Sequence, residues 1–447
     1  MQVASSIRAV VPSQHHADSV LLYLANHGQY VKSIDIAGTS DGCEPTVTFH
    51  ELPYSLQGLT SLVAKGLRLQ LQPGDGHQGV LGLGAAPKQL QVDGCMLLDG
   101  VEALTAALSL LPGLQHLSIV DNSNSDSVVH SWRLDVPSGD LQQLTYLELT
   151  WCNLEVPDSL QHLQAMTGLQ DLRLGIVSGY IESLSSYCVK ASMLLGLKHL
   201  TRLQLFHMLG RAMLMEPGAL AGHTQLQHLM IRGCSYFQEG EAEAEELLSH
   251  LQKMQHLTHL DLGSYNASHQ EPSVPTAAYS AVTASSKLQH LDISCCMLPP
   301  GAWQHMFPAG RHLPHLQALV VNEVRHPSGA AVAPEVSRLV SCCPGLQTLL
   351  MDYMQYSSEL LAPLTGLSSL HELSLRSACV STEGMEVVSQ LTGLRRLTLY
   401  GCSHAVGLML SLTHLQQLTY LELREPNLTT VVLQNQVSST GVGHMCR

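Results

Sequence analysis

A nine-residue pattern of leucines, repeated along the chain, most constrains what this sequence can fold into. Leucines occupy its first and fourth places, a leucine or isoleucine its sixth and a cysteine its ninth in residues 144–152, 226–234, 288–296 and 394–402. In an extended segment alternate side chains point the same way. The fourth and sixth places therefore face one side, and the third, fifth and seventh places face the other. One such strand cannot bury its apolar side alone, so we expect successive copies to stack into a parallel sheet over a continuous core.

The pattern recurs with uneven spacing over most of the chain. The expected strands start near Val31, Leu67, Leu90, Leu114, Leu144, Leu169, Leu200, Leu226, Leu257, Leu288, Leu316, Leu346, Leu370, Leu394 and Leu418. This spacing predicts about fifteen repeats. Apolar residues at helical spacing precede the strands, as in 384–391, so helices or irregular turns are expected as an outer layer. The long intervals 121–140 and 264–287 are predicted to be inserted loops, the second of them mobile.

The ends of the chain differ from the repeats between them. Residues 1–30 are expected to form an N-terminal cap with a short helix over 17–24 that ends near Gly28. Residues 31–428 are then the repeat domain. Residues 429–447 are expected to be a C-terminal tail, within which 430–433 can pair as a last strand.

Composition argues against several classes of protein. The 447 residues are 45% hydrophobic, which allows a large core, and only 13% charged, with a net charge of -14 and no long basic run. Binding of nucleic acid or of a membrane surface through charge is therefore not expected. No uncharged apolar stretch approaches the roughly 20 residues of a membrane span. The start of the chain lacks the apolar run of a signal peptide.

The cysteines point to a reducing environment. The chain has 12 of them. Those that fall at the ninth place of the pattern, where a small buried thiol is expected, are Cys95, Cys152, Cys234, Cys296 and Cys402. Such placement suits a core residue better than a disulfide partner. We therefore expect a cytoplasmic protein.

The pattern resembles intracellular leucine-rich-repeat proteins of the cysteine-containing and ribonuclease-inhibitor-like types. Residues 343–346 (Cys-Pro-Gly-Leu) look like the lead-in to a strand of the first type, and residues 380–385 (Val-Ser-Thr-Glu-Gly-Met) look like its helix start. The resemblance covers 31–428. It implies a right-handed α/β horseshoe, with a parallel sheet on the concave face and helices and irregular turns on the convex face.

The resemblance also implies protein binding but does not choose a partner. The many Leu-Gln-His-Leu units look like the expanded repeat proteins of green algae, some of which sit on the ciliary axoneme. Many proteins of these families are F-box adaptors of ubiquitin ligases. An F-box would have to precede the first strand, and the sequence offers too few residues there. An adaptor role would therefore require that this module is missing or that the chain is partial.

Two motifs are candidates for chemistry. Residues 74–79 match G-x-G-x-x-G, but the glycine-rich residues 80–87 follow where a helix would have to begin, so nucleotide binding is not expected. His228, His259 and His290 hold the third place of consecutive repeats and should stack about 4.8 Å apart.

Asp261 and Asp292 lie on the same face as these histidines, and such ligands suit a transition metal. The alternative is coincidence, because histidine occurs 25 times in the chain. We expect no bound metal or cofactor, and no enzyme, since no catalytic motif has the context that it requires.

The expected concave face offers better candidates for a binding site. Binding hot spots favour Tyr, Trp and Arg. One cluster, in the last repeats, comprises Arg376, Tyr400 and Arg424 in one column and Arg396 and Tyr420 in another, with Glu372 and Glu422 among them. A second cluster comprises Tyr146, Trp151, Arg173, Arg202, Phe206 and Arg232. The alternative is that any exposed sheet must show polar residues.

These observations predict a monomeric, non-catalytic scaffold that binds a protein partner on its concave sheet. Two other functions stay open. The chain can be the substrate-recognition part of a ubiquitin-ligase adaptor that lacks its F-box. It can also be a structural protein of the cytoskeleton or the axoneme.

Overall fold

The structure is a computed structural model in which the chain divides into two compact units, Met1–His223 and Thr224–Arg447. The two are called the N-terminal unit and the C-terminal unit below. The structure describes residues 5–39, 45–48, 56, 58–70, 87–97, 104, 108, 111–120, 141–152, 161–176, 188–189, 191–207, 214–216, 218–233, 242–263, 274–325, 335–351, 357–376, 380, 382–400, 412–424 and 431–434. The G-x-G-x-x-G motif and the predicted loop at 121–140 lie outside these residues.

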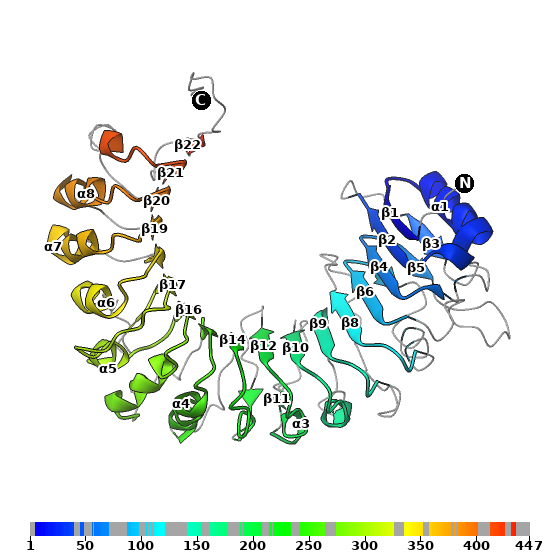
Figure 1. Cartoon of the computed structure of the whole chain (residues 1–447), viewed down its shortest axis with the longest axis horizontal. Coiled ribbons are helices and arrows are strands. Elements are labelled where there is room, and N and C mark those ends of the chain that lie inside the picture. The colour runs from blue at the N-terminus through cyan, green and yellow to red at the C-terminus, as the bar shows by residue number, and fades with distance from the viewer. Residues whose placement is uncertain are drawn as a thin grey trace, which may run out of the picture. The chain divides into compact units, whose positions relative to one another are not determined.

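The N-terminal unit is built on a ladder of parallel strands (Figure 1). In order of pairing these are β1 (Ser6–Val11), β2 (Ser33–Gly38), β4 (Ser61–Lys65), β6 (Gln89–Asp93), β8 (His116–Val120), β9 (Tyr146–Cys152), β10 (Asp171–Ile176) and β12 (Arg202–His207). Residues at equal places of the pattern pair with each other, as Tyr146 does with Asp171 and Asp171 with Arg202.

The second layer of the N-terminal unit contains short strands as well as helices. It comprises the parallel strands β3 (Thr46–Thr48), β5 (Arg68–Gln70) and β7 (Met96–Leu97), the pair β11 (Cys188–Val189) and β13 (Leu214–Met215), and the short helices η4 (Gln161–Ala165) and α3 (Ala191–Leu194). Helix α1 (Gln14–His27), followed by η1 (Gly28–Tyr30), packs beside β1 and β3 at the start of the unit.

The C-terminal unit repeats the inner ladder. Its parallel strands are β14 (His228–Arg232), β15 (His259–Asp261), β16 (His290–Asp292), β17 (Ala318–Val320), β18 (Thr348–Leu350), β19 (Glu372–Leu375), β20 (Arg396–Tyr400) and β21 (Tyr420–Arg424). Strand β22 (Val431–Gln434) then pairs with β21 in the antiparallel sense. The predicted last strand is thus present. Over the described residues, the inner ladders of the two units together contain 16 parallel strands.

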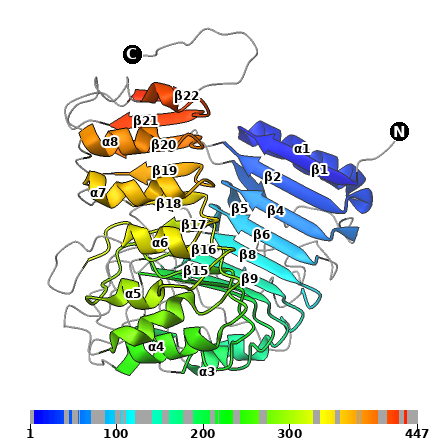
Figure 2. The same cartoon turned by 60° about the vertical axis from the view of Figure 1, so that its left-hand side comes forward.

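The second layer of the C-terminal unit is helical (Figure 1, Figure 2). It comprises α4 (Ala242–Lys253), η5 (Thr276–Thr283), α5 (Ala302–Met306), α6 (Val336–Cys342), α7 (Ser358–Leu361), η6 (Ala362–Gly366), α8 (Thr382–Ser389) and η7 (Leu412–His414). The α/β fold with one parallel strand for each copy of the pattern is consistent with a repeat solenoid.

The core lies between the two layers and follows the leucine pattern. Fourth-place leucines such as Leu172, Leu291 and Leu397 have no exposed surface. The ninth-place Cys296 is also buried, and its thiol donates to the carbonyl of Leu262, whereas the ninth-place Cys95, predicted to be buried, is only partly so. Among the helices that the structure describes, none combines the length and the apolar character that crossing a bilayer requires.

Three expectations from the sequence need correction. Strand β1 pairs with β2, so Val31 does not begin the first strand. The second predicted strand, near Leu67, belongs to the outer layer as β5, and the inner strand is β4. The pattern was hidden there because an alanine, Ala64, holds the sixth place. Finally, the part of the predicted loop at 264–287 that the structure describes contains η5, with Tyr279 buried.

Candidate functional site

The candidate site is the side of each inner ladder that carries the third, fifth and seventh places of the pattern, here called the polar face. Burial alternates along the strands as the pattern predicts. In β4 and β6 the fourth and sixth places are buried and the third and fifth are half-exposed. The described part of the polar face carries several groups of interacting side chains, of which one in the N-terminal unit and two in the C-terminal unit contain candidate binding residues.

The first group, the N-terminal cluster, is centred on the ring of Tyr146. It comprises His116, Ser118, Tyr146, Glu148, Asp171, Arg173 and Arg202. The imidazole of His116 stacks on the Tyr146 ring with centroids 3.9 Å apart and an interplanar angle of 6°. The guanidinium carbon of Arg173 lies 5.1 Å from the centroid of the same ring. The flanking strands β8 and β10 thus both supply a contact to this ring.

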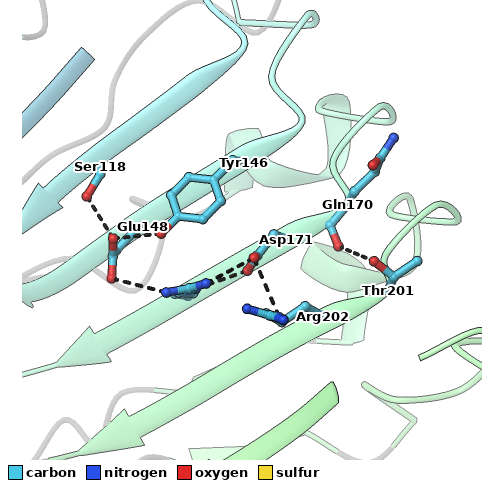
Figure 3. A network of polar contacts seen from close by, with 8 residues as sticks. Ser118, Tyr146, Glu148, Gln170, Asp171, Thr201 and Arg202 are labelled. Carbon is cyan, nitrogen blue, oxygen red and sulfur yellow. Dashed lines mark hydrogen bonds and ion pairs between the residues drawn. The ribbon is translucent and has the colours of Figure 1, made fainter. Parts of the chain in front are cut away.

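Two carboxylates hold the N-terminal cluster together (Figure 3). Glu148 Oε2 accepts hydrogen bonds from the Ser118 hydroxyl and the Tyr146 hydroxyl, each at 2.7 Å. Asp171 accepts two from Arg173, Nε to Oδ1 and Nη2 to Oδ2, each at 3.2 Å. Arg202 Nε lies 3.7 Å from Asp171 Oδ2. The cluster therefore connects four consecutive strands through charge and hydrogen bonds.

Burial and hydrogen bonding shift the pKa of two aromatic members of this cluster. Burial, together with the hydrogen bond to Glu148, raises the pKa of Tyr146 above its usual range. Burial lowers the pKa of His116, although the charge of Glu148 acts in the opposite direction. Tyr146 therefore stays a donor, and neutral His116 stacks on it.

Two other predicted residues of this region have different surroundings. Phe206 lies over Gly175 of the neighbouring strand, where an added Cβ would come within 2.2 Å of the Phe206 ring. The glycine thus leaves the space that the ring fills. Trp151 belongs to β9, but its side chain lies outside the described residues.

The second group, the aspartate bridge, comprises Arg232, Asp261 and Asp292 in the C-terminal unit. Arg232 Nε donates to Asp261, at 2.8 Å to Oδ1 and 2.7 Å to Oδ2, and Nη2 donates to Asp292 Oδ2. The other oxygen of Asp292 accepts from the backbone N–H of Ser294 at 2.8 Å. Arg232 therefore reaches from β14 across β15 to β16.

Gly263 leaves space beside this contact. An added Cβ at Gly263 would lie 3.2 Å from Arg232 Nε and 3.1 Å from Asp261 Oδ1. Burial raises the pKa of Asp261, and the neighbouring charge of Asp292 adds to that, although Arg232 opposes both. Two buried carboxylates thus share one guanidinium.

The predicted histidine ladder is present beside the aspartate bridge. The rings of His228 and His259 stack at 5.1 Å, and those of His259 and His290 at 5.9 Å. The two aspartates, however, are engaged by Arg232 rather than by the imidazoles. Over the described ranges, no group of three or more His, Cys, Asp or Glu is placed to hold a metal ion.

The third group, the C-terminal cluster, contains two arginine–tyrosine stacks. It comprises Glu372, Arg376, Arg396, Tyr400, Tyr420 and Glu422. The guanidinium carbon of Arg376 lies 4.9 Å from the centroid of the Tyr400 ring, and that of Arg396 lies 4.9 Å from the centroid of Tyr420. Arg424 pairs with Tyr400 along the backbone, as its column predicts, but its side chain lies outside the described residues.

Glu422 joins the two stacks. Its Oε1 accepts from the Tyr400 hydroxyl at 2.7 Å, and its Oε2 accepts from the Tyr420 hydroxyl at 3.0 Å. Arg396 Nε lies 3.4 Å from Glu372 Oε1. Within the predicted columns, Arg376 with Tyr400 and Arg396 with Tyr420 are therefore in contact, and Glu422 binds both tyrosine hydroxyls.

The charged side chains of the polar face are layered. The Arg232 side chain is 47% exposed, against 8% for Asp261 and 5% for Asp292. Arg202 is 42% exposed and its partner Asp171 19%. Arg396 is 56% exposed and its partner Glu372 is 36% exposed. In each of these pairs the guanidinium is more exposed than its carboxylate, and the difference is largest at the aspartate bridge.

Sequence reasoning missed two parts of this surface. From the sequence, the carboxylates count only as neighbours of the arginines and have no expected role in orienting the arginine side chains. The available signal is an acidic residue at the fifth place of the pattern, next to a column of arginines. It also missed the apolar pair Val320 and Leu350, which are paired fifth-place residues of β17 and β18. Their signal was an apolar residue where the pattern is otherwise polar.

No protein-family model and no curated protein sequence matches this chain. The arrangement of the polar face therefore carries the functional argument.

Proposed function

We propose that this chain is a leucine-rich-repeat scaffold that binds a partner protein on its polar face and catalyses no reaction. The observation that carries the proposal is the order of the C-terminal cluster. Its arginines lie on tyrosine rings whose hydroxyls are both bound by Glu422.

Order of this kind favours binding for an energetic reason. Immobilising a flexible side chain in an interface costs about 0.5–1.5 kcal/mol. Side chains that are already held by stacking and hydrogen bonds lose less freedom when a partner arrives. Tyr and Arg are also the residue types that most often dominate binding energy. The C-terminal cluster therefore combines suitable residues with a prepared geometry.

The spacing of the two layers supports a curved scaffold in the C-terminal unit. Neighbouring strands lie about 4.8 Å apart, whereas packed helices need about 8–10 Å. A helical second layer thus favours bending with the strands on the inside. The polar face would then be the concave side of about eight repeats in that unit, which suits a partner segment that can touch several strands at once.

The chemistry of the polar face supports binding over catalysis. In the N-terminal cluster the Ser118 hydroxyl donates to a carboxylate, as an activated nucleophile can, but Ser118 is only 1% exposed. A substrate would have no access to it. In the arginine–carboxylate pairs of the described clusters the more exposed groups are the guanidiniums, which recognise partners but do not act as bases at neutral pH.

The test is affinity purification of the tagged chain from its own cells at physiological salt. It is run beside a triple variant with Arg376, Tyr400 and Arg424 changed to alanine. Arg338→Ala is the matched control, because Arg338 pairs with Glu335 at helix α6 in the second layer, away from the polar face. We expect a partner that the control retains and the triple variant loses.

Partner identity then separates the functions that the sequence left open. Ubiquitin-ligase subunits among the captured proteins would make the chain an adaptor. Tubulin-associated proteins would make it a structural protein. A partner that the triple variant retains fully, or no specific partner at all, would contradict binding at the C-terminal cluster.

A further inference from the structure

The third-place row of the polar face repeatedly stacks planar side chains from neighbouring strands. In the N-terminal unit His116 stacks on Tyr146 of the next strand, with ring centroids 3.9 Å apart. In the C-terminal unit Arg396 lies over the ring of Tyr420, which is again its partner on the next strand. In both cases a ring from the following strand covers one face of a planar side chain.

The histidine ladder begins the same arrangement and stops short of its last ring. His228, His259 and His290 stack in turn across β14, β15 and β16. The row then continues with Ala318 on β17 and Thr348 on β18. Within the described residues, the ring that His290 contacts is that of His259. The other face of the His290 imidazole therefore meets a methyl group on the next strand instead of a ring.

The space above Ala318 has the width of one aromatic ring. His290 and Thr348 flank it on the neighbouring strands, about 9.6 Å apart at about 4.8 Å per strand. A ring midway between them would lie about 4.8 Å from the imidazole, within the range of about 4.5–7 Å at which aromatic rings attract each other. All three residues are half-buried, so the space is open on the polar face.

We propose that this space, the ring site formed by His290, Ala318 and Thr348, receives an aromatic side chain of the partner protein. The side chain stacks on His290 and adds a ring to the ladder. Aromatic side chains suit such a place because they supply a large, rigid contact at a low cost in entropy. This inference rests on the proposed binding function and names one contact of the partner.

The charge of the chain favours a protein side chain over a nucleobase of similar shape. The net charge is -14. A nucleobase in a nucleic acid brings phosphates with it, and a protein of this charge repels them. An aromatic side chain brings no charge of its own, so the stacking on His290 is not opposed.

The ladder holds the imidazole in place before a partner arrives. His290 stacks on His259 at 5.9 Å, and Nδ1 of His259 lies 2.9 Å from the hydroxyl oxygen of Thr258. A side chain that is already held loses less freedom on binding. The stacked rings therefore offer a fixed, flat surface to the incoming ring.

The experiment selects peptides on the whole chain from a display library of random 12-residue sequences. Peptides that also bind the variant Ala318→Tyr are removed, because its tyrosine should fill the ring site as Tyr146 covers His116. The expected winners contain Phe, Tyr or Trp. Changing that residue to leucine keeps an apolar side chain but removes the ring, and it should weaken binding about threefold to tenfold.

A second protein variant locates the contact without filling the site. His290→Leu removes the ring on which the peptide stacks, so it should weaken each winner about threefold to tenfold. Combining it with the leucine peptide should cause little further loss, because both changes remove the same contact. His305→Leu, the same substitution on α5 in the second layer, should leave affinity unchanged. The thermal unfolding midpoint shows that each variant is folded.

The methyl group of Ala318 reports the ring directly. An aromatic ring above a methyl group shifts its proton resonance upfield. In protein labelled with carbon-13 at alanine methyl groups, the Ala318 signal should therefore move upfield when a winner is added. The leucine form of the same peptide should not produce this shift. The signal is assigned by its absence from the spectrum of Ala318→Gly.

The failure of this inference differs from the failure of the proposed function. Winners that bind equally well in their leucine form, or that bind His290→Leu as they bind the unchanged protein, would overturn the ring site. So would a captured partner that the triple alanine variant loses but that both Ala318→Tyr and His290→Leu retain fully, and the binding function would then stand. If no peptide and no captured partner depends on the polar face, both proposals fail.

Discussion

The two units share an inner ladder but differ in the layer behind it. The N-terminal unit backs its ladder partly with strands, including β3, β5 and β7, whereas the C-terminal unit uses helices such as α4, α6 and α8. The inner strands also differ in length: β9 has 7 residues and β16 has 3. The leucine pattern therefore determines the inner layer, while the segments between its copies determine the outer one.

The clusters of the two units differ in the same way. In the N-terminal cluster the Tyr146 ring has a stacking partner on each flanking strand, and both carboxylates have several donors. In the C-terminal unit one guanidinium serves two buried aspartates. The first arrangement shares each charge among several partners, whereas the second has a single cation, Arg232, beside one backbone N–H on each aspartate.

The largest expected effect is the loss of stability when a buried leucine is removed from the inner layer, and it tests whether the cores of the two units are packed equally tightly. Leu172→Ala in the N-terminal unit and Leu291→Ala in the C-terminal unit each remove a side chain with no exposed surface from the fourth place. Each should lower the free energy of unfolding by about 3 kcal/mol, because a cavity is left in a packed core. Urea unfolding followed by circular dichroism measures both. A much smaller loss in one unit would show that its core is less tightly packed.

The second largest expected effect is the loss of stability when one arginine is removed from the aspartate bridge or from the N-terminal cluster. Arg232→Met leaves Asp261 and Asp292 without their shared cation and should cost about 3 kcal/mol. Arg173→Met should cost only about 1 kcal/mol, since Arg202 stays near Asp171 and two hydroxyls stay on Glu148. Urea unfolding of both variants gives the comparison.

The control for the aspartate bridge is a second substitution. Adding Asp292→Asn to Arg232→Met should restore part of the lost stability, because it removes one of the two neighbouring charges. Equal costs for the two arginine variants, or no recovery in the double variant, would contradict this account.

The smallest effect is an opposite response of the two units to acid. The lowered pKa of His116 gives stability that is present above its unfolded value of 6.5 and is lost as the pH falls through the folded pKa. The raised pKa of Asp261 acts the other way: its contribution is present below the unfolded value of 3.8 and is lost as the pH rises through the folded pKa.

Unfolding free energies measured over a pH series check the two signs. His116→Phe keeps a stacking ring and should remove the loss below pH 6.5. Asp261→Asn should remove the gain on acidification. If the unfolding free energy of either variant still changes with pH as it does in the unchanged protein, the substituted residue does not cause that pH dependence.

Much of the inner ladder was predictable because its cause is local. Two leucines a residue apart mark a buried strand, and stacking such strands puts His228, His259 and His290 in one row, as the structure confirms. The prediction failed where alanine replaced leucine, as at Ala64 in β4. An alanine in the sixth place fills the core adequately but is no signal in a sequence.

The contacts of the candidate site were less predictable because they depend on how far side chains reach. The columns of arginine and tyrosine follow from the register. That Arg232 crosses a whole strand to Asp292 follows instead from the length of its side chain, with space left beside it at Gly263. The hydrophobicity or charge of individual residues along the sequence does not show how far a side chain reaches.

The residue-for-residue pairing of neighbouring strands has a consequence for how such a chain can change over generations. Duplication or loss of one whole repeat leaves each flanking strand with a partner in the same register, so the new neighbours can bond as the old ones did. An insertion of one residue inside a strand would instead turn its leucines toward the polar face. Recombination between repeats can therefore reshuffle the rows of the binding surface, while the length of the pattern itself is held constant.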